Sequence, residues 1–489
     1  MLEMKHPVKG YLRSKKRFQF SLLAISLLWY FALFPGRLGF DYSEAIRIMQ
    51  KGESTDWWTA SFWWYLKLTT FNGQTIVFSS LLSLFILGCS LFYLCESLNG
   101  EKFTNRIALL VLFCSPLYGG FGVNISHDVF AAAGIIIFTG YHIRVLRNLD
   151  KSKNFGLVPL IFGSILVVTT HYGVYLVALN VLLLFYRRNF KLGTVITLVT
   201  VATIMITSVG VKQVPKYGPI LVFLADLKCV AQHPQAEIST SEWELLNSLA
   251  PKTEWKTQIK CSFIDDALAA MPSLDLNKVQ LDRELIRVYL NVSARNPAIV
   301  ALAHFQRASV ALPPPFFAGP KNQVNLDPDS PIGLGTNTAL QSNPGVLHPS
   351  IDEPSVAFKV TAFKPLEVPA QGLVFVVNQA SWFWGWGGLW LWPILIYLLL
   401  FLKRNAQGSI LPILSSTILL HGLLLILGAP LPRYVMATIL LGNYLLLVMI
   451  SEWYLKYIKS EKTNSNSSSN FRLDSLRRNV PLRSRKKTV

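Results

Sequence analysis

Charged residues are scarce in this chain, and their scarcity excludes a soluble globular protein of this size. Only 15% of the 489 residues are charged, whereas 52% are hydrophobic and the mean hydropathy is +0.39. Soluble domains carry about 25% charged residues, so much of this chain must face a solvent other than water. Acidic residues are the scarcer kind, with 27 Asp and Glu against 46 Lys and Arg. The basic excess lies beside apolar runs, where it marks cytoplasmic ends of membrane spans and argues against nucleic-acid binding.

Cysteine is also rare, and the N-terminal apolar run lacks a signal-peptide cleavage site. Five cysteines are too few for a disulfide scaffold. Two of them, Cys229 and Cys261, lie in the one long polar segment, where a bridge and two free thiols are both open alternatives. The apolar run begins near Phe18 and is followed by Phe34-Pro-Gly-Arg37 in place of small residues. We therefore expect this run to be retained as the first membrane span.

Apolar runs of membrane-spanning length predict an all-α polytopic membrane protein with about ten transmembrane helices. The run from Phe155 to Tyr186 is too long for one span, and the polar break Thr169-Thr-His-Tyr-Gly173 predicts two short helices instead. Basic residues then fall in every connection that this count assigns to the cytoplasm, which favours the split and puts both termini inside. The predicted spans are 18–36, 74–96, 106–123, 128–146, two within 155–186, 192–211, 383–402, 409–428 and 435–457.

These spans divide the chain into five segments. One of them, the loop domain, is expected to be a small helical cap followed by Pro- and Gly-rich irregular structure. The tail is expected to be held near anionic lipid. The segments are the basic cytoplasmic N-terminus 1–17, the first seven spans 18–211 with the extracytoplasmic loop 37–73, the extracytoplasmic loop domain 212–380, the last three spans 381–457, and the basic disordered cytoplasmic tail 458–489.

Ionisable residues near the membrane collect on the extracytoplasmic side, where they are functional candidates because exposure to hydrocarbon is costly. Asp41 and Glu44 also fit a helix-capping pair, and Asp128 fits an N-cap of the fourth span. Arg433 could instead extend its side chain to the interface. His421, in the middle of the ninth span, is interpreted as a helix–helix hydrogen bond. Neither capping nor interfacial placement predicts that all the candidates converge on one side: Asp41, Glu44, Asp56, Asp128, His171, Arg433 and Tyr434.

The order and sidedness of these residues resemble the GT-C superfamily, integral membrane glycosyltransferases that take a sugar from a polyprenyl-phosphate carrier and transfer it outside the cytoplasm. Such enzymes carry an acidic residue in the first outer loop, as Asp41 does in "LGFDYSEAIRIMQKG", and another before the fourth span, as Asp128 does in "NISHDVF". Many carry a phosphate-binding basic residue near a late turn, which Arg433 in "APLPRYVM" resembles. The segment "TDWWTASFWW" is similar to a bacterial GT-C stretch, with Trp58 and Thr59 in place of its His and small residue.

The resemblance implies an enzyme of the bacterial plasma membrane that transfers a hexosyl or pentosyl group to a glycan, lipid or protein acceptor outside the cytoplasm. Asp41 would be the catalytic base, and Arg433 would pair with the carrier phosphate. Asp41 and Asp128 could also hold a divalent metal cation, which stays an open alternative. A lipid-linked glycan flippase or transporter and a glycan polymerase or ligase also stay open. Substrate binding would involve Glu44, Asp56, Asp128, His171, Arg433 and Tyr434.

Overall fold

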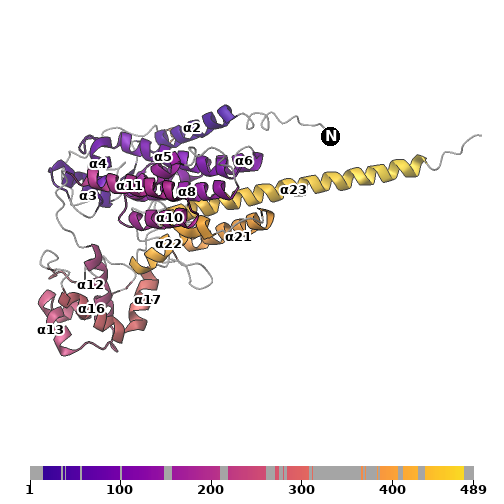
Figure 1. Ribbon diagram of the computed structural model, residues 1–489. Helices are drawn as coiled ribbons and strands as arrows, with labels where there is room; N and C mark the ends of the chain where they lie inside the picture. The colour runs from indigo at the N-terminus through magenta and orange to yellow at the C-terminus, as the bar shows by residue number, and fades with distance from the viewer. Residues whose placement is uncertain are drawn as a thin grey trace, which may run out of the picture.

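A bundle of apolar helices carries a smaller helical domain at one end (Figure 1). The only β structure among the described residues is one parallel pair, β1 (Arg37–Leu38) with β2 (Asn124–Ile125). The computed structural model describes residues 15–34, 37–38, 40–54, 58–99, 102–147, 157–209, 218–259, 261, 270–274, 279, 283–307, 311, 365–366, 369, 383, 386–405, 411–427 and 435–477.

The bundle helices are those of an all-α membrane protein, as the sequence predicts. Within the described residues, α5, α8, α11 and the Met436–Ile458 part of α23 are long and apolar enough to cross a membrane, and further apolar helices are shorter. The bundle consists of α2 (Lys15–Ala32), α5 (Val77–Ser97), α6 (Phe103–Cys114), α7 (Pro116–Gly122), α8 (His127–Leu146), α9 (Leu157–Val167), α10 (Gly173–Tyr186), α11 (Phe190–Ser208), α21 (Gly387–Asn405), α22 (Leu411–Leu427) and α23 (Met436–Arg477).

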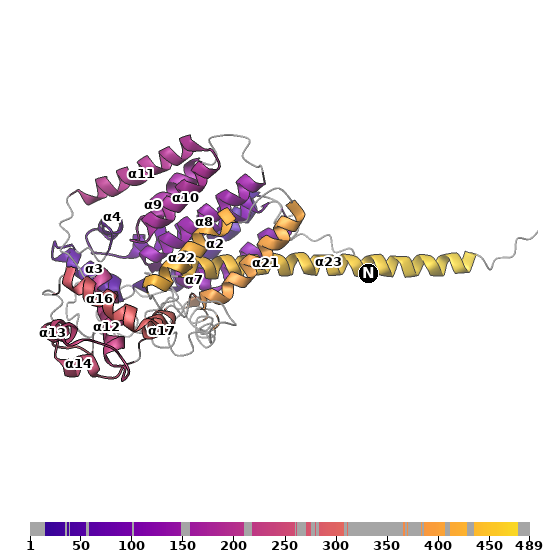
Figure 2. The same ribbon diagram turned by 60° about the horizontal axis from the view of Figure 1, so that its bottom comes forward.

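Helix α8 is the centre of the bundle, and α11 lies on its outside (Figure 2). In the most apolar 18-residue stretch of each helix, 83% is buried in α8 and 17% in α11. Helix α11 therefore presents most of its apolar surface to its surroundings. Small residues let α9 approach α8 closely. A Cβ on Gly134 would lie 2.7 Å from the carbonyl oxygen of Gly163. This close contact is typical of helix pairs in membranes.

Two interruptions between helices show how the local sequence determines where a helix ends. The stretch predicted as one span over 106–123 forms two consecutive helices, because α6 ends at Cys114 and α7 starts at Pro116. Pro116 suits the first turn of a helix, where no N–H partner is needed, and Ser115 caps it by accepting from Leu117 N. The predicted break within 155–186 does occur, between α9 and α10. Its turn requires Gly173, since a Cβ there would lie 1.8 Å from the carbonyl oxygen of Val167.

Polar contacts join helix ends that the predicted topology assigns to the same, cytoplasmic side. Lys15 at the start of α2 lies 3.2 Å from Glu96 near the end of α5. Arg147, which follows α8, donates to the carbonyl oxygen of Ser97 at 2.9 Å. The opposite end of the bundle carries two short helices that follow α2, α3 (Phe40–Gln50) and α4 (Ala60–Thr69), and also the smaller domain (Figure 1).

Helix α23 extends past the bundle to Arg477 (Figures 1 and 2). The sequence analysis places the start of a disordered tail at residue 458, so the structure differs from it over 458–477. The membrane-length part of α23 supplies a formed helix, and adding residues to a formed helix avoids the cost of nucleation.

The smaller domain is the helical part of the loop domain. Its core surrounds Trp255, whose Nε1 donates to the carbonyl oxygen of Leu246 at 2.8 Å. A disulfide joins Cys229 to Cys261, with Cα atoms 5.9 Å apart, so the structure adopts the bridged alternative. The expected irregular part lies mostly outside the described residues. The helices of this domain are α12 (Gly218–Ala231), α13 (Thr240–Leu249), α14 (Lys252–Lys256), α16 (Arg283–Arg295) and α17 (Pro297–Arg307).

Candidate functional site

Three segments that are distant in the sequence meet around the carboxylate of Asp128. The β1–β2 pair places the chain after α2 beside the chain before α8, with Leu38 opposite Ile125. Helix α3 follows β1 at once, and its Tyr42 is fully buried. The Tyr42 hydroxyl donates to Oδ2 of Asp128 at 3.3 Å. From the turn between α9 and α10, the Tyr172 hydroxyl donates to Oδ1 at 3.2 Å.

Local sequence holds the Asp128 carboxylate at the start of α8. Ser126 is the N-cap residue, and its hydroxyl accepts from Asp128 N and donates to Asp128 Oδ2, each at 3.0 Å. The expectation that Asp128 itself is the N-cap is therefore wrong. Asp128 lies in the first helical turn, where the helix dipole stabilises a negative charge. Its side chain is buried, and Nε2 of the partly exposed His127 lies 3.6 Å from Oδ1.

Helix α4 closes one side of this site with an aromatic side chain. The ring of Phe62 packs against Tyr42 and His127, with ring centroids 5.7 and 5.3 Å apart. Two hydroxyls fix the start of α4 onto the turn after α9. Thr59 Oγ1 donates to the carbonyl oxygen of Thr169 at 2.6 Å, and Ser61 Oγ donates to that of Val168 at 2.9 Å. The elements α3, α4, α8 and the α9–α10 turn thus form one connected site, which we call the outer site after the side on which the predicted topology places it.

The structure brings only some of the predicted residues to the outer site. Asp41 and Glu44 lie within the first two turns of α3, so Asp41 does not precede the helix as an N-cap residue would. Their side chains are outside the described part. His171 is exposed, and its neighbour Tyr172 contacts Asp128 instead. The predicted helix–helix role of His421 is confirmed, since its Nε2 lies 2.8 Å from Thr438 Oγ1 of α23. Outside the described residues lie Asp56, Arg433 and Tyr434.

Sequence reasoning missed the hydroxyl groups of the outer site. Tyr42 lies between the predicted acids Asp41 and Glu44, and Tyr172 directly follows the predicted His171. Ser126 carries a recognisable signal, because serine two residues before an acid at the start of an apolar run is typical of a helix N-terminus. No local signal identifies the two tyrosines as ligands of a carboxylate, since their contacts cross 86 and 44 residues.

The donors around Asp128 decide how well it would hold a metal ion. Oδ2 accepts from Ser126 and Tyr42, and Oδ1 accepts from Tyr172. Hydroxyl donors therefore compete with a divalent cation for the lone pairs of both carboxylate oxygens. In the described part of the chain, no group of three or more His, Cys, Asp and Glu side chains could hold a metal. Asp128 is therefore suited to hydrogen bonding, and we derive no step through a metal.

Comparisons with known proteins leave the outer site as the basis for a functional conclusion. The chain matches no protein family, no curated protein and no solved structure. A helical membrane fold is compatible with many activities, so function has to be argued from the residues of a site.

Proposed function

We propose that this chain is a membrane glycosyltransferase that moves a sugar from a polyprenyl-phosphate carrier to an acceptor outside the cytoplasm. The contact between Tyr42 and Asp128 carries the proposal. It joins the first outer loop to the turn before the fourth span, the two segments in which the GT-C-like acids lie. Asp41 directly precedes Tyr42 in α3 and is the proposed base.

Two residues of the chain act directly on the reacting groups. Asp41 takes the proton from the acceptor hydroxyl as its oxygen bonds to the anomeric carbon of the sugar. The bond from that carbon to the carrier phosphate breaks, and the carrier phosphate leaves with the electron pair. Arg433 pairs with that phosphate, because a guanidinium matches its oxygens and stays charged. Asp128 and its hydroxyl donors position α3 and thereby the base.

The proposal includes ten spans, both termini in the cytoplasm and the outer site facing the exterior or periplasm of a bacterium. Contacts at the two ends of the bundle support this alternation. Lys15 and Arg147 contact the last turn of α5 at one end, whereas Tyr42 and Tyr172 contact Asp128 at the other. Basic residues concentrate at cytoplasmic ends, so the second end would be the outer one.

Proteoliposomes supplied with a radiolabelled polyprenyl-phosphate sugar test the activity. The proposal expects label to move to a new acceptor, such as an added glycan, lipid or peptide, and expects this transfer to fail with the Asp128→Asn variant. Polar groups at one membrane boundary favour a transferase, since transporters commonly bind at the midplane. Label that crosses the bilayer with its phosphate bond intact would replace the transferase with a flippase.

A further inference from the structure

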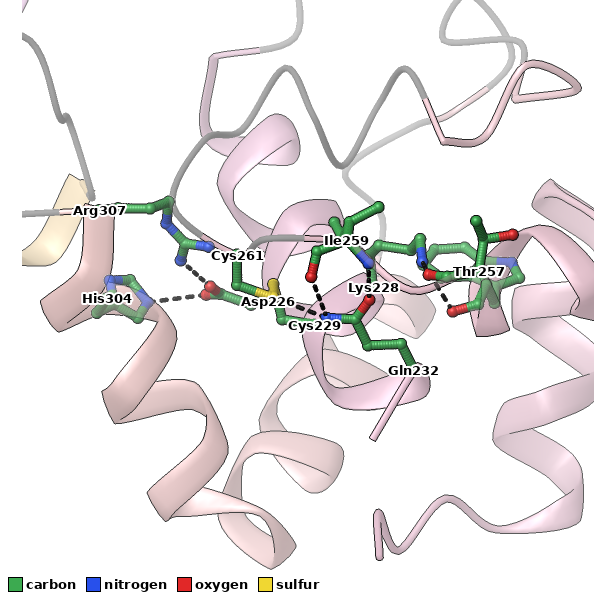
Figure 3. Close-up of a disulfide and its surroundings, with 10 residues drawn as sticks. Asp226, Lys228, Cys229, Gln232, Thr257, Ile259, Cys261, His304 and Arg307 are labelled. Carbon is green, nitrogen blue, oxygen red and sulfur yellow. Dashed lines mark hydrogen bonds and ion pairs between the residues drawn. A yellow bond between two sulfur atoms is a disulfide. The ribbon is translucent and has the colours of Figure 1, made fainter. Parts of the chain in front are cut away.

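A second polar cluster, around Asp226, His304 and Arg307 (Figure 3), joins the loop domain to the membrane helices and shares no residue with the outer site. His304, in the last turn of α17, has its Nδ1 3.1 Å from the carbonyl oxygen of Leu425 in α22. A further contact joins the same two parts, because His421 Nδ1 of α22 lies 2.6 Å from the carbonyl oxygen of Ala311. The cluster therefore lies at the outer end of an apolar helix, where a lipid–water boundary is expected.

One buried carboxylate holds the cluster together. The Asp226 carboxylate of α12 is fully buried and accepts from Arg307, from the Tyr289 hydroxyl at 3.0 Å and from His304 Nε2 at 2.8 Å. Both nitrogens of His304 face acceptor oxygens, one from Asp226 and one from Leu425. His304 and Arg307 thus both contact a single carboxylate.

Arg307 has hydrogen-bonding capacity that the protein does not use. Its side chain is fully buried at the end of α17, and its Nη2 donates to Asp226 Oδ1 (Figure 3). Nε and Nη1 of Arg307 are also buried, yet neither has a hydrogen-bond partner among the residues that the structure describes. Buried guanidinium N–H groups are paired in folded proteins, so a bound molecule or ion is needed to complete this site.

We propose that Arg307 binds a phosphate group at the junction of α12, α17 and α22. A phosphate supplies acceptor oxygens for the unused N–H groups and a negative charge that attracts the guanidinium. The group could belong to the headgroup of a membrane lipid or to free phosphate. This inference does not rest on the proposed glycosyl transfer, since none of its residues belongs to the outer site.

Thermal unfolding of the purified full-length protein in detergent tests the site with two probes. Inorganic phosphate and decyl phosphate, each titrated at constant ionic strength, should raise the unfolding midpoint of the wild-type protein. Decyl maltoside controls for the alkyl chain. Arg307→Lys keeps the charge beside Asp226 but removes the unused guanidinium N–H groups, and it should weaken phosphate binding by about tenfold.

Arg295→Lys is the matched control, because Arg295 also pairs with a carboxylate of the loop domain, that of Glu242, but lies outside the cluster. It should leave the phosphate response unchanged. A response to decyl phosphate at far lower concentration than to inorganic phosphate supports a lipid headgroup, and equal responses support free phosphate.

The proposal is overturned if neither probe stabilises the wild type, or if Arg307→Lys responds as the wild type does, because water would then satisfy Arg307. Should Arg307→Lys fail to fold, Asp226→Asn gives a second test. It removes the competing negative charge and should tighten phosphate binding several-fold. Unchanged or weaker binding in Asp226→Asn would overturn the site.

Discussion

Tyr42 and Asp128, 86 residues apart, meet through a hydrogen bond of 3.3 Å between the tyrosine hydroxyl and the carboxylate. The same hydroxyl lies 2.7 Å from Ser126 Oγ and 3.0 Å from His127 Nδ1. One phenol thus fixes α3, the helix that carries Asp41, onto the start of α8. The position of the proposed base depends on this bond.

Removing that hydroxyl should loosen α3. Tyr42→Phe keeps the ring packed against Phe62 but leaves the buried Asp128 oxygen with one donor fewer. We expect a loss of about 1–3 kcal/mol in the free energy of unfolding, together with lower turnover. Denaturation of the purified variant measures the first effect. Tyr186→Phe is the control, because Tyr186 is 85% exposed and should tolerate the change. Equal stability of the two variants would contradict a structural role for the Tyr42 hydroxyl.

Asp41→Asn separates catalysis from helix stabilisation. Asparagine keeps the shape of the side chain but cannot accept the acceptor proton, so turnover should fall by about 10²–10⁴-fold while donor binding survives. Initial rates of sugar transfer and equilibrium binding of the donor measure the two effects. In the first turn of α3, where Asp41 lies, asparagine loses only the interaction of the charge with the helix dipole, about 0.3–1 kcal/mol. A fully active, well-folded Asp41→Asn protein would therefore leave only a structural role and would move the base to Asp128 or Asp56.

Arg433→Ala should produce the complementary defect. If Arg433 pairs with the carrier phosphate, its removal should weaken donor binding by about 2–5 kcal/mol, as for other charge-assisted pairs that lose one partner. Binding of a fluorescent polyprenyl phosphate to the protein in nanodiscs gives the affinity. Arg188→Ala serves as the control, since Arg188 lies in a predicted cytoplasmic connection. Equal affinities for the wild type and Arg433→Ala would exclude the phosphate role.

Reporter fusions test the predicted topology directly. A reporter placed after Lys403 or in the C-terminal tail should have cytoplasmic activity, and one inserted within 320–350 should have extracytoplasmic activity. The two kinds of site lie on opposite sides of the predicted eighth span. A cytoplasmic signal from the insertion within 320–350 would invert the arrangement and remove the outer site from the exterior.

Lys228 of α12 should make the stability of the loop domain depend on pH. Burial lowers the pKa of this lysine from 10.5 to about 8, although its Nζ donates to the carbonyl oxygens of Trp255 and Thr257 (Figure 3). Between pH 8 and pH 10.5 the unfolded chain binds the proton and the folded chain does not, so stability should rise with pH across this window. Amide hydrogen exchange in α12 and α14 measures the stability of the loop domain. In the Lys228→Met variant, compared with the wild type at each pH, this stability should not rise with pH.

The apolar helices were predictable from the sequence, because hydrocarbon requires apolar segments whatever their partners are, but only four of the described helices reach membrane-spanning length. The turn before Gly173 was predictable as well, since polar residues interrupt an overlong apolar run there. The partners of Asp128 were not. Tyr172 and not its neighbour His171 contacts the carboxylate, and no local pattern in that turn distinguishes the two. The Asp226 cluster was missed because α12 looks like an ordinary apolar helix and its ionic partners lie 78 and 81 residues away.

Two histidine contacts connect the loop domain to α22 and α22 to α23. His304 attaches the loop domain to the last turn of α22, and His421 attaches α22 to Thr438 in the first turn of α23. A movement of the loop domain relative to the bundle would therefore displace α22, and with it the contact between α22 and the start of α23. Arg433 and Tyr434 directly precede that start. Binding of a partner to the loop domain would therefore affect the residues proposed to bind the carrier.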